Sequence, residues 1–332
     1  MSYHSLFYTY KEQLPWTEEG SANAIFPMAV AMTEMGLSAA SVRSMAKGFL
    51  SQHNVLENPK NESLNDFINH NNWKDYLGKK EYYQAFTIFF EKAITDNPEG
   101  IREYFAEMAD GIFGYDFMVL IRLAYAFESG QKEELARALA FLAAGYQSIR
   151  FVLPEIETKV FIEHIVGLKE KAEHYKIEGA HISDKVKFIA DSNQYAADFA
   201  KLEEENLNIF TLRALAIRLV REISHPVMKQ IFCAVHAFRV ISPLLPDVNE
   251  SIQQFYMVMQ AAYLALGCPE LQPAETGAEK SWPLIFQLTG VSKDIPSVLF
   301  IYSCFKEYQF AQSTIYPEMA YSVIHNEIKL ER

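Results

Sequence analysis

Two apolar runs of the sequence carry charged side chains of the kinds that transfer protons or bind anions. Arg122 interrupts the first run, and Glu128 follows six residues later. In the second run, His236 and Arg239 stand three residues apart, so a helix places them on one face. A buried guanidinium needs a carboxylate or several carbonyl partners, and imidazole exchanges protons near neutral pH. These four are the candidate catalytic residues; the alternative is a buried salt-bridge network that only orders the helices.

Generic catalytic signatures are mostly missing from the chain. It has no glycine-rich phosphate loop, no G-x-S-x-G sequence and no C-x-x-C pair, which argues against nucleotide-binding folds, α/β-hydrolases and thioredoxin-like proteins. Ser44 and Lys47 have an S-x-x-K spacing, but the partner motifs that accompany it in serine acyl-enzymes are lacking. We therefore attribute this spacing to chance.

Metal ligation is the next chemistry to consider, because helical di-iron proteins use Glu-x-x-His pairs on two helices. Glu222 and His225 form one such pair, at an expected helix end directly before Pro226. Glu178 and His181 form another, in a glycine-containing turn where the two side chains do not share a helical face. No two of the nine histidines are three or four residues apart. We therefore expect no metal centre.

Composition narrows the function classes further. Of the 332 residues, 50% are hydrophobic and 14% aromatic, which is typical of a globular protein. An excess of 42 acidic over 30 basic residues gives a formal net charge of −12, which disfavours nucleic-acid and anionic-membrane partners. No run approaches the ~20 apolar residues of a membrane span, and the first residues lack the pattern of a signal peptide. The three cysteines match neither a disulfide framework nor a zinc site, so we expect a cytoplasmic protein with buried, reduced thiols.

Helical signals recur along the whole chain, and strand signals are rare. Asn97, Pro98 and Glu99 have the order of an N-cap, a first-turn proline and an early carboxylate. Ser129 and Gly130 end a helix and predict a tight hairpin to the next one. Helices are expected over residues 27–35, 41–50, 61–69, 97–109, 115–128, 131–146, 154–174, 183–202, 207–224, 226–242, 247–266, 296–312 and 317–329. With no repeat or linker, we predict an all-α fold, a single domain of about a dozen helices over residues 1–332, with an ordered loop or lid at 268–283.

Several stretches of the sequence match a known family pattern in the family's own order. The most specific block runs from Trp73 to Tyr146 and contains the segment 117–128 with the hairpin turn after it. Shorter matches are Pro27-Met-Ala-Val-Ala-Met, His236-Ala-Phe-Arg239 and Ser292-Lys-Asp. Together they resemble the questin oxidase-like family. The resemblance implies an oxidoreductase, since fungal members carry out an NADPH-dependent, Baeyer–Villiger-type oxygen insertion that opens an anthraquinone ring.

The resemblance breaks at positions where the family pattern carries histidines. The pattern has one before the Pro-Met step and one where the Leu-Ile-Arg helix begins; this chain has Ile25 and Met118. A third, two helical turns before the His-Ala-Phe-Arg motif, is replaced by Gln230. The family's C-terminal His-x-x-Lys step corresponds to Ser297 and Phe300. Ile, Met and Phe neither transfer protons nor bind metals, so we predict that these five residues line an apolar cavity on a retained scaffold.

Three functional hypotheses follow. In the first, the family's chemistry is altered or lost, an apolar small molecule occupies the cavity, and the four charged residues hold the helices around it. In the second, the chain is an active NADPH-dependent monooxygenase on a flat aromatic or polyketide-like substrate, with His236 as the acid–base residue and Arg122 or Arg239 stabilising an oxyanion or a cofactor phosphate. In the third, a helical module acts through protein contacts alone. The sequence leaves the cofactor, the substrate and the oligomeric state open.

Overall fold

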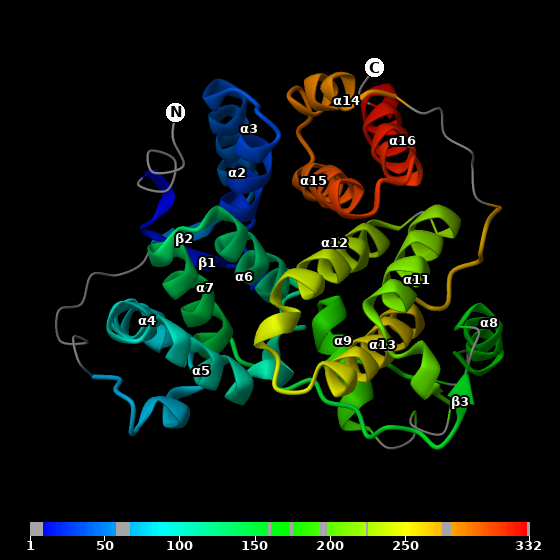
Figure 1. Cartoon of the computed structure of the whole chain (residues 1–332), viewed down its shortest axis with the longest axis horizontal. Coiled ribbons are helices and arrows are strands. Elements are labelled where there is room, and N and C mark those ends of the chain that lie inside the picture. Colours follow the sequence, from blue (N-terminus) through cyan, green and yellow to red (C-terminus); the bar gives the residue numbers. More distant parts are fainter. Residues whose placement is uncertain are drawn as a thin grey trace.

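The computed structural model describes residues 9–57, 67–158, 161–172, 175–192, 195, 198–223, 225–273 and 280–330. Within them the chain is predominantly helical (Figure 1), as the all-α prediction requires. The helices of the first part are α2 (Ile25–Glu34), α3 (Ala39–Gln52), α4 (Tyr83–Asp96), α5 (Ile101–Glu107), α6 (Met118–Ser129) and α7 (Lys132–Ala144). Those that follow are α8 (Phe161–Ala172), α9 (Ile182–Asp191), α11 (Ile209–Glu222), α12 (Pro226–Ile241), α13 (Val248–Ala265), α14 (Trp282–Thr289), α15 (Ile295–Ala311) and α16 (Ile315–Leu330).

Extended structure is limited to two small pairs of strands in the described residues. β1 (Gln13–Thr17) pairs antiparallel with β2 (Val55–Glu57), and β3 (Glu157–Thr158) pairs parallel with β4 (Lys201–Leu202). Short 3₁₀ helices connect several elements: η2 (Trp73–Tyr76), η3 (Lys80–Tyr82), η4 (Pro98–Gly100), η5 (Ala109–Gly111), η6 (Glu204–Asn206) and η7 (Ser242–Leu244). These pieces join helices and form no layer of their own.

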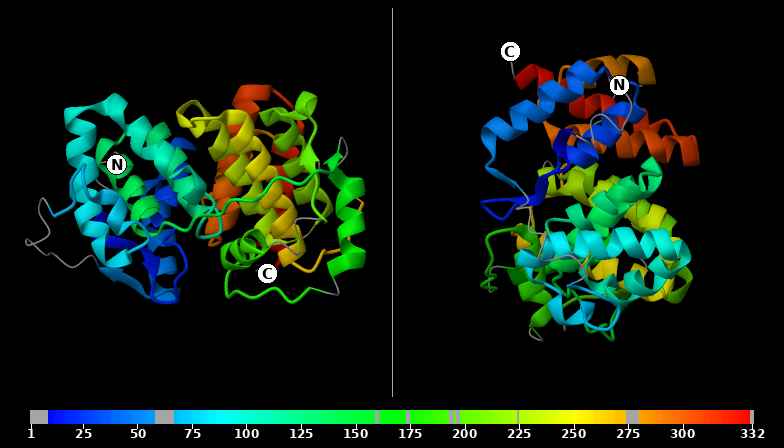
Figure 2. Two further views of the ribbon diagram at one scale, coloured as in Figure 1. Left: turned by 90° about the horizontal axis from the view of Figure 1, so that it is seen from below. Right: turned by 90° about the vertical axis from the view of Figure 1, so that its left-hand side faces the viewer.

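Helix α12 occupies the centre of the molecule (Figure 1) and packs against α6, α11 and α15. Helix α15 also contacts α2 and α16, so α2, α6, α12 and α15 surround one apolar core. The helices of the first part, blue to green, lie beside the later ones, green to red (Figure 2). Helices α6 of the first group and α12 of the second pack against each other where the two groups join.

Helices α12 and α15 run in the same direction. Lys229 contacts Ser297 near their starts, the Phe232 ring lies 5.1 Å from that of Phe300, and His236 contacts a residue still later in α15. Residues that contact each other have increasing numbers along both helices, so α12 and α15 are parallel and their N-termini lie on the same side of the molecule.

Most helices begin and end close to the residues that the sequence predicted. Asn97 and Asp247 accept hydrogen bonds from backbone N–H groups as N-caps, and Gly130 ends α6 with φ 66° in the left-handed region. The His225–Pro226 step separates α11 from α12. All three cysteines are buried and free, in line with the expected reduced thiols.

One helix starts later than predicted, because three residues before it adopt left-handed backbone conformations. Tyr115, Asp116 and Phe117 have φ values of 53°, 53° and 70°, so α6 begins at Met118 and not at Tyr115. Side chains without β-branching tolerate this region at a cost when the surroundings hold them there. Here the Tyr115 ring packs 4.9 Å from Phe141, and Asp116 accepts a hydrogen bond from the Ser183 N–H.

Two predicted helices were wrong in part. The segment after Pro154 is extended as far as β3, and α8 begins only at Phe161. Helix α9 ends at Asp191 and does not continue to Leu202, which belongs to β4. Three buried glutamines of α13 hold these segments, because each side chain both donates to and accepts from the backbone of one residue. The pairs are Gln253 with Leu202, Gln254 with Phe151, and Gln260 with Ala200.

Two helices were missed, and one prediction lies mostly outside the described residues. The aromatic run that forms α4 and the short Trp282–Thr289 helix were not predicted. Most of the helix expected at 61–69 falls on residues that the structure does not describe, and 67–69 are not helical. The centre of the loop expected at 268–283 also lies outside the described residues.

Candidate functional site

His236 lies between two carboxylates contributed by different helices. It is fully buried in α12; its Nδ1 is 3.1 Å from Glu307 Oε1 of α15, and its Nε2 is 3.5 Å from Glu128 Oε2 of α6. The apolar faces of these three helices bury the ring, and the charged atoms meet along their shared seam. We call Glu128, His236 and Glu307 the histidine cluster.

Further polar groups surround the histidine cluster. Arg239 donates from Nε to Glu307 Oε1 at 2.7 Å, and Arg213 of α11 donates to Oε2 at 3.4 Å. On the other side, the Tyr302 hydroxyl donates to Glu128 Oε2 at 3.0 Å, and Lys306 Nζ lies 3.4 Å from Oε1. Each buried carboxylate is therefore matched by cations and donors, which is the condition for burying charge.

The members of the histidine cluster shift one another's pKa values. Burial alone would lower the pKa of His236, but Glu128 and Glu307 together raise it above its ordinary value of 6.5. Burial would raise the pKa of Glu307, yet His236 and Arg239 bring it down to about 2, and the pKa of Glu128 is lowered by His236 in the same way. His236 is fully buried and both of its ring nitrogens face carboxylate oxygens, so it is poorly placed to exchange a proton with a substrate.

Arg122 takes part in a separate ion pair. Its Nε and Nη2 donate to the two carboxylate oxygens of Glu134 on α7, at 2.6 and 3.1 Å, and both side chains are buried. The rings of Phe26 and Phe141 flank the guanidinium at 5.8 and 6.0 Å. The carboxylate partner of Arg122 is thus Glu134, whereas Glu128 belongs to the histidine cluster. Of the four candidate catalytic residues, the structure brings together Glu128, His236 and Arg239.

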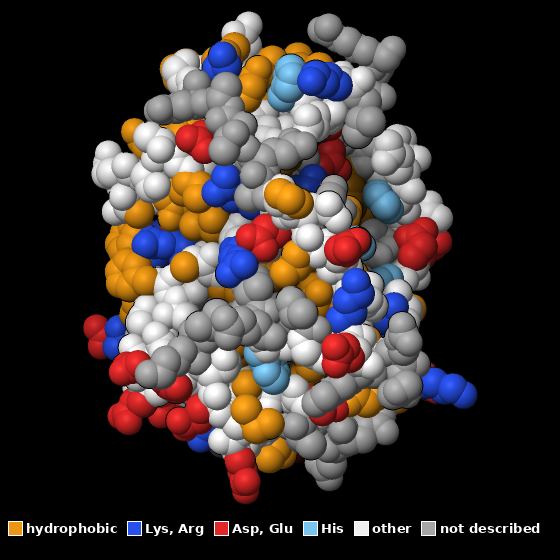
Figure 3. Space-filling view, turned by 90° about the vertical axis from the view of Figure 1, so that its right-hand side faces the viewer, with side chains coloured by type: hydrophobic (Ala, Val, Ile, Leu, Met, Phe, Trp, Pro, Cys, Tyr) orange, Lys and Arg blue, Asp and Glu red, His pale blue; other side chains and the backbone are white. Residues whose placement is uncertain are grey.

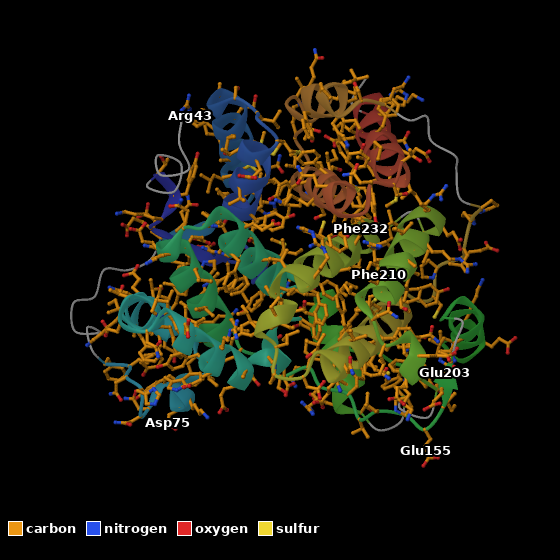
Figure 4. All side chains as sticks on the ribbon, in the orientation of Figure 1. Arg43, Asp75, Glu155, Glu203, Phe210 and Phe232 are labelled. Atoms are coloured by element: carbon orange, nitrogen blue, oxygen red, sulfur yellow. The ribbon has the colours of Figure 1, made fainter. Side chains whose placement is uncertain are left out.

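The five predicted cavity residues lie on four neighbouring helices, in different surroundings. Ile25 lines a recess of about 20 Å³ beside the Arg122–Glu134 pair. Met118 and Phe300 are buried; Phe300 packs against Phe232, which Figure 4 labels on α12. Gln230 is half-buried on α12. Only Ser297 lines a large recess, so a common apolar cavity stays a prediction.

The recess at Ser297 is a groove of about 1020 Å³. Its walls are the end of α11 (220–223), the first turns of α12 and α15, one face of α16, and residues 272–273. We call it the α11–α16 groove. Figure 3 looks onto this side of the molecule, where hydrophobic, acidic and basic side chains are interspersed.

The lining of the α11–α16 groove combines apolar and charged groups. Val220, Ile223, Met319 and Val323 provide apolar surface. At the start of α15, Ser297 donates to Asp294 Oδ2 at 2.5 Å, and Lys229 donates to Ser297 Oγ at 3.2 Å. The acidic lining residues are Glu222, Asp294, Glu318 and Glu327, against the basic Arg221 and Lys229. This surface suits a ligand that is partly apolar and carries polar groups.

Sequence reasoning found Glu128 but missed two other acidic partners of the buried cations. Glu307 and Glu134 are each 1% exposed and neutralise the cations that the sequence singles out. Glu307 interrupts an apolar helix just as Arg122 does, so the same signal could have found it. Metal ligation finds no support in the donor geometry: among the described residues, His, Cys, Asp and Glu side chains nowhere gather in groups of three or more suited to an ion.

A helical fold with buried ion pairs and one large groove defines a class of architecture but no activity. The family model that matches the chain is the questin oxidase-like model, over residues 27–218. Since this is more than half of the chain, the protein belongs to the questin oxidase-like family. No curated protein sequence matches it. The match ends within α11, so His236, Glu307 and all the residues that line the α11–α16 groove lie beyond it. Within the described residues, no helix combines the length and apolar character needed to cross a membrane.

Proposed function

We propose that this chain is a divergent questin oxidase-like protein that binds a small molecule in the α11–α16 groove, with altered or lost oxidoreductase activity. The observation that carries the proposal is the groove of about 1020 Å³ that Ser297 helps to line. We align Ser297 with a histidine of the family pattern, and this alignment is part of the proposal. Ligand sites in proteins have about this volume, ~300–1,000 Å³. Cytoplasmic residence is part of the proposal, supported by the free, buried thiols.

Loss of the family chemistry is supported by the groups that remain. The Ser297 hydroxyl is 1% exposed and is engaged by Asp294 and Lys229, and a hydroxyl does not take up protons near neutral pH. His236 is enclosed between carboxylates, and it is not among the residues that line the groove. Both features favour a structural role for the charged residues over catalysis.

The alternative is an active NADPH-dependent, Baeyer–Villiger-type monooxygenase, which membership of the family supports. The groove does not fit a dinucleotide phosphate, because its four acidic side chains outnumber its two basic ones and repel phosphate groups. The ligand that fits better is smaller, partly apolar and not strongly anionic.

The test is binding of a hydroxylated anthraquinone such as emodin, with turnover measured in parallel. Ser322→Trp fills the groove from α16, and Val152→Trp adds the same bulk at a position that is 71% exposed and outside the groove. We expect binding by the wild-type protein and by Val152→Trp, at least tenfold weaker binding by Ser322→Trp, and no consumption of NADPH. Equal binding by all three would overturn the groove as the site, and rapid NADPH oxidation with the quinone and oxygen would favour the monooxygenase.

A further inference from the structure

His225 is a titratable residue of the α11–α16 groove to which nothing above gives a role. It precedes Pro226 and is the N-cap of α12, where its Nδ1 accepts a hydrogen bond from the Val227 N–H at 3.2 Å. Its side chain also lines the groove. The sequence marks it only as half of a Glu-x-x-His pair.

The cap determines which ring nitrogen carries the proton. A nitrogen that accepts from an N–H group has no proton of its own, so the neutral His225 ring carries its proton on Nε2. Burial lowers the pKa of His225 below 6.5, which maintains the neutral form. Among the described residues, the Val227 N–H is the one group that bonds to this ring. No described residue bonds to Nε2, so its N–H group is a candidate donor to a ligand in the groove.

The charges around the groove limit which acceptor groups of a ligand can bind at this donor. Lys229 is occupied by Ser297 at 3.2 Å and Asp294 at 3.8 Å, so its charge is matched within the protein. The lining as a whole carries more acidic than basic side chains. Both basic residues of the lining, Lys229 and Arg221, already have interactions within the protein. A carboxylate ligand would therefore be disfavoured by this negative lining, whereas a carbonyl oxygen accepts a hydrogen bond without bringing charge.

We propose that His225 orients a neutral ligand in the α11–α16 groove by donating from Nε2–H to a carbonyl-type oxygen, while the acidic lining of the groove disfavours carboxylates. The inference rests on the proposed function, since it assigns the chemistry of the ligand to that same groove. His225 is here a specificity-determining residue and takes no part in a bond-breaking step.

The experiment uses three probes of nearly equal size: acetylnaphthalene, which offers a carbonyl oxygen, ethylnaphthalene, which offers no acceptor, and naphthoate, which is an anion. Titration calorimetry with the full chain measures each affinity. His225→Ser keeps an N-cap oxygen before Pro226 but removes the Nε2–H donor, and His225→Ala removes both. Thermal melting separates the two effects, because only His225→Ala loses the cap.

For the wild-type protein we expect acetylnaphthalene to bind about fivefold to tenfold more tightly than ethylnaphthalene, and naphthoate to bind most weakly. In His225→Ser, acetylnaphthalene and ethylnaphthalene should bind equally tightly, while the melting temperature stays close to that of the wild type. A preference that survives in His225→Ser, or is absent from the wild type, overturns the role of His225 alone. A wild-type protein that binds none of these probes and no anthraquinone overturns the proposed function as well.

Discussion

At the scale of single residues, buried charges are neutralised by partners from distant parts of the chain. His236, 0% exposed, meets Glu128 and Glu307, which come from helices before and after its own. A buried ion network of this kind contributes little relative to a well-packed apolar core, but removing one member leaves an uncompensated charge. Each member of the network is therefore expected to matter more when it is removed alone than the whole network contributes to stability.

Replacing Glu307 should show this asymmetry. Glu307→Gln leaves His236 and Arg239 without their shared carboxylate, and we expect the free energy of unfolding to fall by about 3–5 kcal/mol. The control is Glu107→Gln, which breaks an exposed 2.8 Å ion pair with Lys74 and should cost less than ~1 kcal/mol. Urea unfolding at neutral pH measures both. Equal losses for the two variants would mean that the buried carboxylate contributes no more than a surface one.

At the scale of elements, local signals predicted helix ends well and long-range effects poorly. Asn97, Gly130 and Pro226 mark their boundaries through side-chain or backbone geometry that one segment contains by itself. The segment after Pro154 reads as helical, yet α13 glutamines hold the neighbouring chain extended at Phe151, and no local pattern reveals that. In the site, the shared face of His236 and Arg239 was predicted correctly, because both contact Glu307; the position of Glu307 itself depends on how α15 packs.

Two glycines test the local part of this account. Gly130 has φ 66°, and no other atom lies within 4 Å of the point that a Cβ would occupy, so Gly130→Ala should destabilise the protein by about 1 kcal/mol through backbone strain alone. Gly48 lies inside α3 with equally open space, and Gly48→Ala should stabilise it by ~0.5–1 kcal/mol. Differential scanning calorimetry gives both signs. A stabilising Gly130→Ala would show that the hairpin turn does not need the left-handed conformation.

At the scale of the whole molecule, the histidine cluster couples stability to acidity. The pKa of Glu307 is about 2 in the folded protein against an ordinary 4.5, so protons bind the unfolded chain first as the pH falls. The contribution of Glu307 is complete above pH 4.5 and is lost progressively toward pH 2. His236 behaves in the opposite sense, because its raised pKa gives a contribution that is present below pH 6.5 and is lost as the pH rises through its folded value.

Acid unfolding measures the first of these effects. Between neutral pH and pH 3, the wild-type protein should lose ~2 kcal/mol more stability than Glu307→Gln, which has no carboxylate to protonate at that position. Urea midpoints at a series of pH values provide the comparison. Parallel curves for the two proteins would show that Glu307 titrates normally in the folded state.

The order in which these helices are synthesised has a consequence for how the protein matures. Tyr125 contacts Leu299 and Ser303, which are 174 and 178 residues later in the sequence. His236 contacts Glu307, which is synthesised 71 residues after it. Until residues 295–311 have been synthesised, the apolar faces of α6 and α12 that α15 covers in the folded protein remain exposed. Nascent chains should therefore bind chaperones until α15 has emerged from the ribosome. A premature stop codon just before α15 should prevent folding as fully as one near the start of the gene.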